Sequence, residues 1–340
     1  MQANAKIGGA ESKHIPNFAQ FSKFAPLMTT LIEDISQTLS EAGLRHCIAH
    51  TGLLPDGYGH IICTSASGGS SKAILPVNIS ARTPNEASQA SQMYAKADTA
   101  ITESLGERPI IITQDRWERQ RKMMKARLLA HLGIFTPAYA RNCEVRRIGK
   151  EEAADFLARS HSYGDAACRY RYGMFLRRHT GHLASIMNGT GQQAKDILIP
   201  GTLVAVAEFS NARKWTKGGK EIKSYEWTRY ASLPGIRVCG GMGKMLRTFM
   251  QDVKPDDIMS YADIEWSDGN VYESLGFTKE STKDPVFFTI DSSTYERTAL
   301  RTSGDNSCGA ISDGIPGASE PFYFKNWGSY KYRLKITDYQ

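Results

Sequence analysis

Residues 224–277, SYEWTRYASLPGIRVCGGMGKMLRTFMQDVKPDDIMSYADIEWSDGNVYESLGF, decide the fold of this chain. Their pattern predicts a strand over residues 225–230, a Pro/Gly loop, an amphipathic helix and a second strand over residues 258–262. A short helix that carries Tyr272 follows and stops at Gly276. This order predicts an α/β domain in which a glycine-initiated helix connects two strands.

The start of the central helix is rich in glycine. Gly240, Gly241 and Gly243 stand there, and Lys244 follows them directly. Glycines let a ligand approach the first N–H groups of a helix, and the helix dipole favours negative charge at that end. Lys244 adds a compact positive charge. We therefore predict that these four residues bind an anionic group.

The order of strand, glycine loop, helix, strand and Tyr-x-x-x-Gly-Phe resembles the acyl-CoA-binding half of the GNAT acyltransferase superfamily. From residue 140 onward the chain also resembles the GNAT-like domain of phage DNA-modification proteins such as Mom. It is similar as well to the C-terminal domains of phage homing-endonuclease-like proteins. The matching segments are ARNCEVRRI, FLARSHSYG, YEWTRYAS, GGMGKML, SYADIEWSDGNVYESLGF and NWGSYKYRLKI.

The resemblance implies a GNAT-like mixed sheet flanked by helices, with acetyl-CoA as the acyl donor. It implies that the glycine loop with Lys244 holds the pyrophosphate, and that Asn270 contacts the cofactor or the loop backbone. Tyr272 occupies the position at which such enzymes place a tyrosine near the thioester sulfur, as the general acid. The alternative for Tyr272 is an aromatic side chain that only packs.

Acyl transfer to an amine also needs a group that accepts the proton of the amine. Glu226, on the first strand of the core, is the candidate base, and the alternative is an ion pair with Arg229. Asp263 ends the second strand, at the edge where open α/β sheets bind ligands. We expect Asp263 either to orient the amine or to cap the next helix. His161 either faces the substrate or caps its own helix.

Composition is that of a globular protein, with 41% hydrophobic and 23% charged residues in 340. The sequence has no apolar run of roughly 20 residues and no signal-peptide pattern. We therefore expect a cytoplasmic protein without a membrane partner. Six scattered cysteines predict reduced thiols and no metal site. The net charge of +7 favours a polyanionic partner.

Residues 1–133 are predicted to form a smaller α/β domain that precedes the GNAT-like domain of residues 138–340. The smaller domain has helices over residues 24–42 and 84–105. Its strands are expected over residues 47–50, 60–64, 74–80 and 109–113. This layout is similar to half of a nuclease core, but the strand LPVNIS carries Asn78 where a nuclease needs an acid for Mg²⁺. We predict a nuclease-like remnant or a DNA-docking domain.

Residues 114–132 are predicted to form one strongly basic helix. We expect its cations to contact DNA phosphates, and the alternative is a solvated face of an interdomain helix. In the larger domain Trp266 either stacks on a base or is buried. The candidate nucleic-acid residues are Arg116, Arg119, Lys125, Arg127 and Trp266.

The rest of the larger domain is predicted as strands alternating with helices and long polar loops. Strands are expected over residues 143–148, 170–175, 203–209, 286–290 and 330–336, and helices over residues 150–159 and 292–300. Residues 179–201 and 302–320 are predicted to be loops, and residues 214–223 a basic hairpin tip.

Together these features predict an acyl-CoA-dependent N-acyltransferase that acts on an amino group of a modified base in phage DNA. An example is 5-aminomethyl-deoxyuridine, whose modification would protect viral DNA from host restriction. The expected partners are DNA and other phage DNA-modification enzymes. One alternative is a Mom-like modification of adenine. The other is a DNA-binding module derived from a homing endonuclease, without catalysis.

Overall fold

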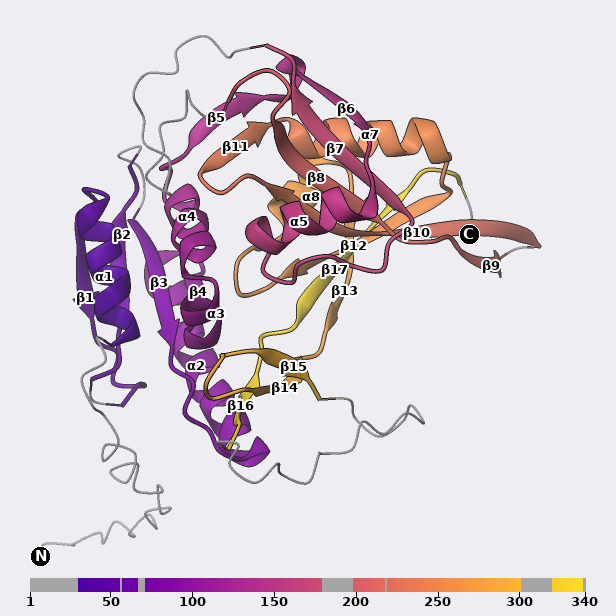
Figure 1. The fold of residues 1–340 in the computed structure, drawn as a ribbon. Helices are drawn as coiled ribbons and strands as arrows, with labels where there is room; N and C mark the ends of the chain where they lie inside the picture. Colours follow the sequence, from indigo (N-terminus) through magenta and orange to yellow (C-terminus); the bar gives the residue numbers. More distant parts are fainter. Residues whose placement is uncertain are drawn as a thin grey trace, which may run out of the picture.

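A computed structural model describes residues 30–55, 57–66, 71–178, 198–217, 219–300 and 320–338. Figure 1 shows a smaller N-terminal unit beside a larger unit built on a long, twisted sheet. Most of the loops predicted at residues 179–201 and 302–320 lie outside the described residues. Among the described helices, none is long and apolar enough to cross a bilayer.

The N-terminal unit is a four-stranded sheet in the order β1-β2-β3-β4 with helices on both faces. Its elements are α1 (Leu31–Glu41), β1 (His46–Ala49), β2 (His60–Thr64), β3 (Ser71–Val77), α2 (Pro84–Leu105) and β4 (Ile110–Thr113). Ile74 of β3 packs in the cluster that contains α1, whereas its neighbour Leu75 packs in the cluster that contains α2. Because both faces are covered, the central strands β3 and β4 are buried over the apolar runs AILPV and III. The predicted smaller α/β unit is confirmed.

The basic helix predicted over residues 114–132 is wrong in one respect, because it is two helices. α3 (Gln114–Arg119) and α4 (Arg121–His131) meet at Gln120, whose φ of −127° and ψ of 32° are not helical. The break lets Trp117 of α3 and Leu128 of α4 pack together in one buried cluster. Both helices lie between the small sheet and the large unit, not on an outer face (Figure 1).

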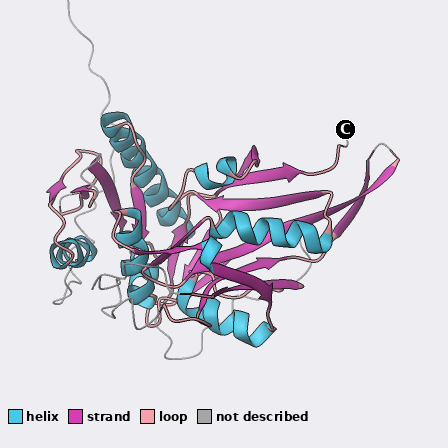
Figure 2. Ribbon diagram, turned by 90° about the horizontal axis from the view of Figure 1, so that it is seen from above, coloured by secondary structure: helices cyan, strands magenta, loops and turns pink. Residues whose placement is uncertain are grey.

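The larger unit contains an eight-stranded mixed sheet in the order β13-β17-β12-β10-β8-β7-β6, with β9 added beside β10. β10 and β12 are parallel, and the other pairs are antiparallel. Its elements are β6 (Cys143–Arg147), α5 (Lys150–Ser160), β7 (Tyr170–Leu176), β8 (Leu203–Phe209), β9 (Arg213–Lys217), β10 (Lys220–Ser232), α7 (Gly241–Val253), β12 (Asp257–Asp263), α8 (Asn270–Ser274), β13 (Thr278–Lys283) and β17 (Ser329–Lys335). The predicted mixed sheet flanked by helices is confirmed (Figure 2).

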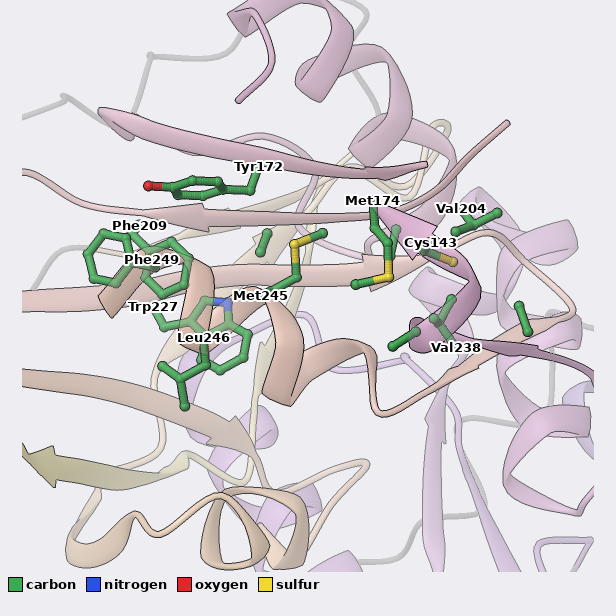
Figure 3. Close-up of a cluster of buried hydrophobic side chains, with 14 of the residues drawn as sticks. Cys143, Tyr172, Met174, Val204, Phe209, Trp227, Val238, Met245, Leu246 and Phe249 are labelled. Carbon is green, nitrogen blue, oxygen red and sulfur yellow. The ribbon is translucent and has the colours of Figure 1, made fainter. Parts of the chain in front are cut away.

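Opposite faces of this sheet bury α5 and α7. Val206 of β8 packs with Phe156 of α5, whereas Phe209 faces the cluster that holds α7. Figure 3 shows this second cluster, in which the rings of Phe209 and Phe249 stack at 3.8 Å with 3° between their planes. Trp227 of β10, which pairs with Phe209 across the sheet, also stacks on its ring, with centroids 5.3 Å apart. This packing fixes α7, and with it the glycine loop, against β10.

Two short parallel strands were not predicted. β5 (Thr136–Tyr139) pairs with β11 (Ile236–Cys239), which joins the segment after the N-terminal unit to the segment before α7. Pro137 falls between the two predicted domains, and proline interrupts most strands. It lies at a strand edge, where proline is tolerated. The boundary between residues 133 and 138 itself stays a prediction.

The segment that links β13 to β17 forms a separate three-stranded sheet beside the N-terminal unit. Its strands are β14 (Phe287–Ile290), β15 (Arg297–Ala299) and β16 (Phe322–Lys325). Phe288 and Phe324 bury against Tyr94 of α2. The helix predicted over residues 292–300 is wrong. There Asp291 accepts hydrogen bonds from the Ser293 and Thr294 amides, so the chain turns into β15.

Candidate active site

The parallel strands β10 and β12 part at their carboxyl ends. Their pairing runs from Ser224 opposite Asp257 to Trp227 opposite Ser260. Beyond this point the described pairing of β10 is with β8 and that of β12 is with β17. The register of β10 against β8 shifts between Trp227 and Arg229, which is a bulge that bends the strand. The two parallel strands therefore open at this end of the sheet.

A hollow of about 270 Å³, here called the strand-end cavity, lies at this divergence. It is lined by both strands, by α4, by the α5–β7 loop and by the segments that flank the three-stranded sheet. The side chains that matter below are Arg127, His161, Tyr163, Glu226, Asp263 and Lys283. The cavity sits where open α/β sheets place their ligands.

Helix α7 begins as the sequence predicts for an anion site. Gly240 precedes it with φ of 75°, a left-handed conformation that favours glycine, and no side chain caps the helix. A Cβ on Gly241 would lie 2.5 Å from the Tyr230 hydroxyl, so this position also requires glycine. Gly243 faces Leu275, whose side chain would lie 3.3 Å from an added Cβ. The first amides of α7 remain available to an anion.

Lys244 is hydrogen-bonded within the protein, and its contact with a pyrophosphate stays a prediction. Its ammonium group donates hydrogen bonds to the backbone carbonyls of Ala140 and Cys143, which ties α7 to the start of β6. Arg141 and Arg247 line the same side of α7, on an open hollow of about 530 Å³. Since Arg247 is exposed one turn after the glycines, it is the better placed cation for an anion at this helix.

Tyr272 lies at the base of the strand divergence. Its hydroxyl is 2.9 Å from Ser260 Oγ, and Ser260 Oγ donates to the carbonyl of Trp227 at 2.8 Å. Its ring stacks on Tyr332 with centroids 5.2 Å apart. Burial raises the pKa of Tyr272, while the Ser260 hydrogen bond acts in the opposite direction. The hydroxyl is thus protonated at neutral pH and fixed where β10 and β12 separate.

We expect Tyr272→Phe to lower kcat by about 10-fold and to leave the Kd for acetyl-CoA unchanged. The effect is modest because a thiol with a pKa near 8.5 leaves readily even when the departing thiolate is poorly protonated. Steady-state kinetics and a binding titration measure the two quantities. An unchanged kcat would remove Tyr272 from the chemistry and leave it as a packed aromatic.

Glu226 is half-buried and lines the strand-end cavity from β10. Its backbone is fixed by Ser210, whose Oγ accepts from the Glu226 amide at 2.9 Å. The alternative ion pair with Arg229 is not formed, because that guanidinium donates to the carbonyls of Gly164 and Thr228. Within the described residues the Glu226 carboxylate has no ion-pair partner, so it is free to accept a proton.

The backbone of β10 beyond the divergence is partly occupied. The carbonyl of Trp227 accepts from Ser260, that of Thr228 from the Arg229 guanidinium, and that of Arg229 from the Trp227 indole at 2.9 Å. These three carbonyls are therefore not wholly free for a ligand between the strands. Each carbonyl keeps one further lone pair, so a donor can still bind there.

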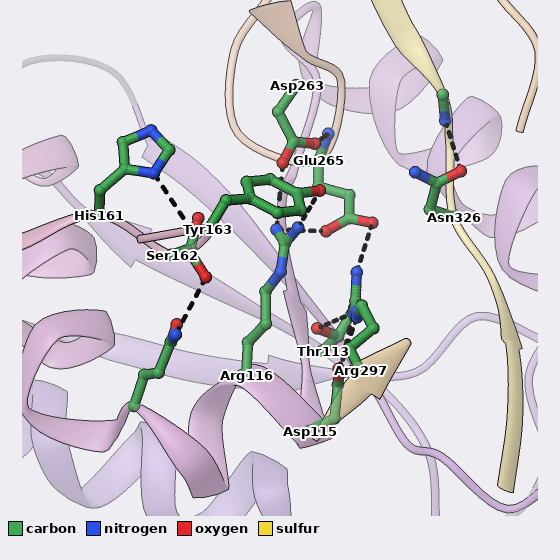
Figure 4. A network of polar contacts seen from close by, with 12 residues as sticks. Thr113, Asp115, Arg116, His161, Ser162, Tyr163, Asp263, Glu265, Arg297 and Asn326 are labelled. Carbon is green, nitrogen blue, oxygen red and sulfur yellow. Dashed lines mark hydrogen bonds and ion pairs between the residues drawn. The ribbon is translucent and has the colours of Figure 1, made fainter. Parts of the chain in front are cut away.

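Asp263 belongs to a buried ionic network between the two units (Figure 4). Its Oδ2 lies 3.1 Å from Arg116 Nη1, and the same nitrogen lies 2.8 Å from Glu265 Oε2. Arg116 also donates to the Tyr163 hydroxyl. Burial opposes ionisation of Asp263, but the charge of Arg116, and to a lesser extent that of Arg127, lowers its pKa. Asp263 thus fixes the end of β12, and because it also lines the strand-end cavity, its contact with an amine stays a prediction.

His161 ends α5 and also lines the cavity, so both of its expected positions hold. Its Nδ1 accepts a hydrogen bond from the Tyr163 amide at 3.2 Å. Burial, followed by the charges of Arg229, Arg127 and Arg116, lowers the pKa of His161 to about 3. A ring that resists protonation in this way is a poor base, which leaves Glu226 as the better candidate.

The cations expected to contact DNA are largely paired within the protein. Arg116 is 5% exposed and bound to carboxylates. Arg119 lies 3.2 Å from Glu296, and Lys125 lies 3.7 Å from Asp34. Trp266 is 4% exposed, so it cannot stack on a base. The predicted phosphate-contacting helix is therefore wrong for Arg116, and base stacking is wrong for Trp266.

The remaining predicted contacts are open. Asn270 is exposed at the first position of α8, next to Gly269, and its contact with a cofactor stays a prediction. Arg127 lines the strand-end cavity and does not face outward. Among the described residues, no cluster of three or more His, Cys, Asp or Glu side chains is arranged to hold a metal ion.

The loop that follows His161 is anchored by a buried acid that the sequence did not reveal. Glu208 of β8 accepts hydrogen bonds from Arg171 Nε at 3.0 Å and from the Ala166 amide at 3.2 Å. Burial raises the pKa of Glu208 from 4.5 to about 7, and Asp165 contributes to the rise. Glu208 therefore carries a proton over a range of pH in which the unfolded chain does not.

This shift predicts how stability depends on pH. Between about pH 4.5 and pH 7 the folded protein binds a proton at Glu208 that the unfolded chain has lost. The contribution of Glu208 to stability is therefore complete below pH 4.5 and declines as the pH rises to 7. Denaturant unfolding at several pH values should show that Glu208→Gln removes this decline. The control Glu103→Gln, at an exposed position of α2, should keep it.

No family model matches the chain, and no curated protein matches it. Solved acetyltransferases align with somewhat over half of it. One from Bacillus subtilis, solved with CoA, covers 58% of this chain and 99% of its own at 11% identity, with a TM-score of 0.31. NAA60 from Arabidopsis thaliana, solved with a bisubstrate analogue, covers 57% and 99% at 10% identity, with a TM-score of 0.30. Ribosomal-protein-S5-alanine acetyltransferase from Vibrio fischeri covers 58% and 96% at 10% identity, with a TM-score of 0.29.

The case for a GNAT-like core rests on the topology of the chain itself. A parallel pair, β10 and β12, is joined by a helix that starts at an uncapped glycine cluster. The pair opens at its carboxyl ends, and a tyrosine from the following helix lies at the base of the opening. The core of the larger unit has a GNAT-like fold.

Proposed function

We propose that this protein transfers an acyl group from acyl-CoA, with acetyl-CoA as the donor, to an amino group. The observation that carries the proposal is the opening between β10 and β12. Glu226 lines the strand-end cavity there, and the Tyr272 hydroxyl contacts Ser260 where the two strands part. Acetyl-CoA supplies an acyl group activated as a thioester. The uncapped amides at Gly241 and its neighbours are suited to its diphosphate.

The chain's own residues account for the proton movements of this reaction. An amine in the strand-end cavity attacks the thioester carbonyl, so that a C–N bond forms and the C–S bond breaks. Glu226 accepts the proton that the amine loses, and the Tyr272 hydroxyl donates a proton to the departing thiolate. The N–H groups of β10 past the bulge are suited to polarise the carbonyl. No further oxidant or reductant is required.

For the acceptor we propose an amino group on a modified base of phage DNA, such as 5-aminomethyl-deoxyuridine. The net charge of +7 supports a polyanionic partner. Cations gather on the β9–β10 hairpin, which projects beyond the rest of the sheet (Figure 1). Those on its described side chains are Arg213, Lys214, Lys220 and Lys223. This surface replaces α3 and α4 as the proposed contact with the DNA backbone.

Two measurements test the proposal. Titration of the full chain with acetyl-CoA should show saturable binding, which a DNA-binding module without catalysis would lack. Labelled acetyl-CoA is then incubated with phage DNA and with an oligonucleotide that contains 5-aminomethyl-deoxyuridine, and the digested nucleosides are analysed by mass. Label on the modified base supports the full proposal. Label on adenine supports the Mom-like alternative, and saturable binding with no labelled nucleoside removes DNA as the acceptor.

A further inference from the structure

Arg127 of α4 presents its guanidinium to the strand-end cavity without an acceptor for its N–H groups. It lines the cavity, and the described residues provide it with no hydrogen bond or ion pair. Its one described contact is with the ring of Trp266, whose centroid lies 4.2 Å from the guanidinium carbon. A guanidinium carries five N–H donors, and stacking on an aromatic face leaves all of them at its edge.

The two other arginines around the cavity are already engaged. Arg116 binds the carboxylates of Asp263 and Glu265, and Arg229 donates to two backbone carbonyls. The Lys283 side chain is exposed, so its charge remains hydrated. Asp263 is the carboxylate whose charge most favours the protonated form of Arg127. It is already bound by Arg116.

An arginine held in this way is suited to a ligand. Burial lowers the pKa of Arg127 to about 10, so the side chain is still charged at neutral pH. A partly desolvated charge without a partner is unfavourable, and an anion that enters the cavity would remove this cost. The edge of a guanidinium matches the two oxygens of a carboxylate or a phosphate.

We propose that Arg127 binds an anionic oxyacid group, a carboxylate or a phosphate, on the molecule that is acylated. The inference rests on the proposed function, because it takes the strand-end cavity as the acceptor site. Glu226 lines the same cavity from β10, so the amine and the anion of one acceptor would be held by different units of the protein. The N-terminal unit thereby determines the specificity of a reaction carried out in the GNAT-like unit.

The first test measures anion binding without turnover. The thermal midpoint of the full chain is followed with rising inorganic phosphate or acetate at constant ionic strength. We expect Arg127→Gln to weaken binding of the preferred anion by roughly 10- to 100-fold, since a hydrogen-bonded charge pair is lost. The matched control Lys122→Gln removes the same charge from an exposed position of α4 and should bind as the wild type does.

The second test compares acceptors that differ in one anionic group. The pairs are 5-aminomethyl-deoxyuridine with and without a 5′-phosphate, and an α-amino acid with its amide. In the wild type the charged member of the preferred pair should have a KM roughly 10- to 100-fold lower. Arg127→Gln should remove this difference with little change in kcat for the uncharged member, and Lys122→Gln should preserve it.

The outcomes separate this inference from the function on which it rests. Acylation of amines with the same preference in Arg127→Gln as in the wild type overturns the anion site and leaves the function standing. Anion binding that depends on Arg127, with no amine acylated, supports the site and removes the function. Arg127→Met, which retains packing on Trp266 without the charge, gives the same comparison if the glutamine variant does not fold.

Discussion

Replacing Glu226 by glutamine is expected to lower kcat by roughly 100- to 10,000-fold, the usual contribution of a positioned general base. Glutamine has nearly the same shape but cannot accept the proton of the attacking amine. Because Glu226 lies in the strand-end cavity and not at the glycine loop, the Kd for acetyl-CoA should remain unchanged. Steady-state kinetics and a titration with acetyl-CoA measure these quantities.

Glu221→Gln is the matched control, since it changes a glutamate on the same strand outside the cavity. Glu221 is 55% exposed and pairs with Lys214 at 3.2 Å on the projecting hairpin. For acceptors without phosphate groups its kcat should equal that of the wild type. If Glu226→Gln retained more than about a tenth of the wild-type kcat, a water molecule or another group would have to be the base.

Arg116→Met is expected to destabilise the protein by about 3–5 kcal/mol, the usual result of removing one partner from a buried ion pair. The side chain is 5% exposed, and its loss leaves Asp263 and Glu265 without their main counter-charge. It also releases the Tyr163 hydroxyl, so the α5–β7 loop loses a contact with the N-terminal unit. Denaturant unfolding measures the free energy of unfolding.

Arg119→Met provides the control on the same helix. Its ion pair with Glu296 joins side chains that are 40% and 59% exposed, and such pairs contribute about 0–1 kcal/mol. Adding Glu265→Gln to Arg116→Met should recover part of the lost stability, since one of the two uncompensated charges disappears. A loss below about 1 kcal/mol for Arg116→Met would show that water or rearrangement replaces the network.

The fold of the core could be predicted because its signals are local. The alternation in β10, the amphipathic pattern of α7 and the glycines before it each lie within about a dozen residues. The predictions failed where a partner distant in the sequence decides the outcome. Nothing local shows that residues 136–139 pair with 236–239, and the turn at Asp291 overrides a helical pattern.

The candidate site divides in the same way. Tyr272 was proposed from the resemblance to GNAT enzymes and Glu226 from its place on a core strand. Tyr272 lies where β10 and β12 part and Glu226 lines the strand-end cavity, while their catalytic roles stay predictions. The hydrogen bonds of Lys244 could not be predicted, since its partners are backbone carbonyls about 100 residues earlier in the chain. Arg116 and Arg127 looked alike as cations of one basic helix. The break at Gln120 and the packing of Trp266 place the first in a buried network and the second in the cavity.

By itself the sequence determined most of the succession of strands and helices and the position of the glycine-initiated helix. These follow from periodicity, from glycine's freedom and from the order of elements. Only the tertiary structure decided which charges are neutralised and which remain free. Whether Arg127 has a partner depends on where Asp263 and Arg116 lie in space, and they are brought there by the packing of two separate sheets.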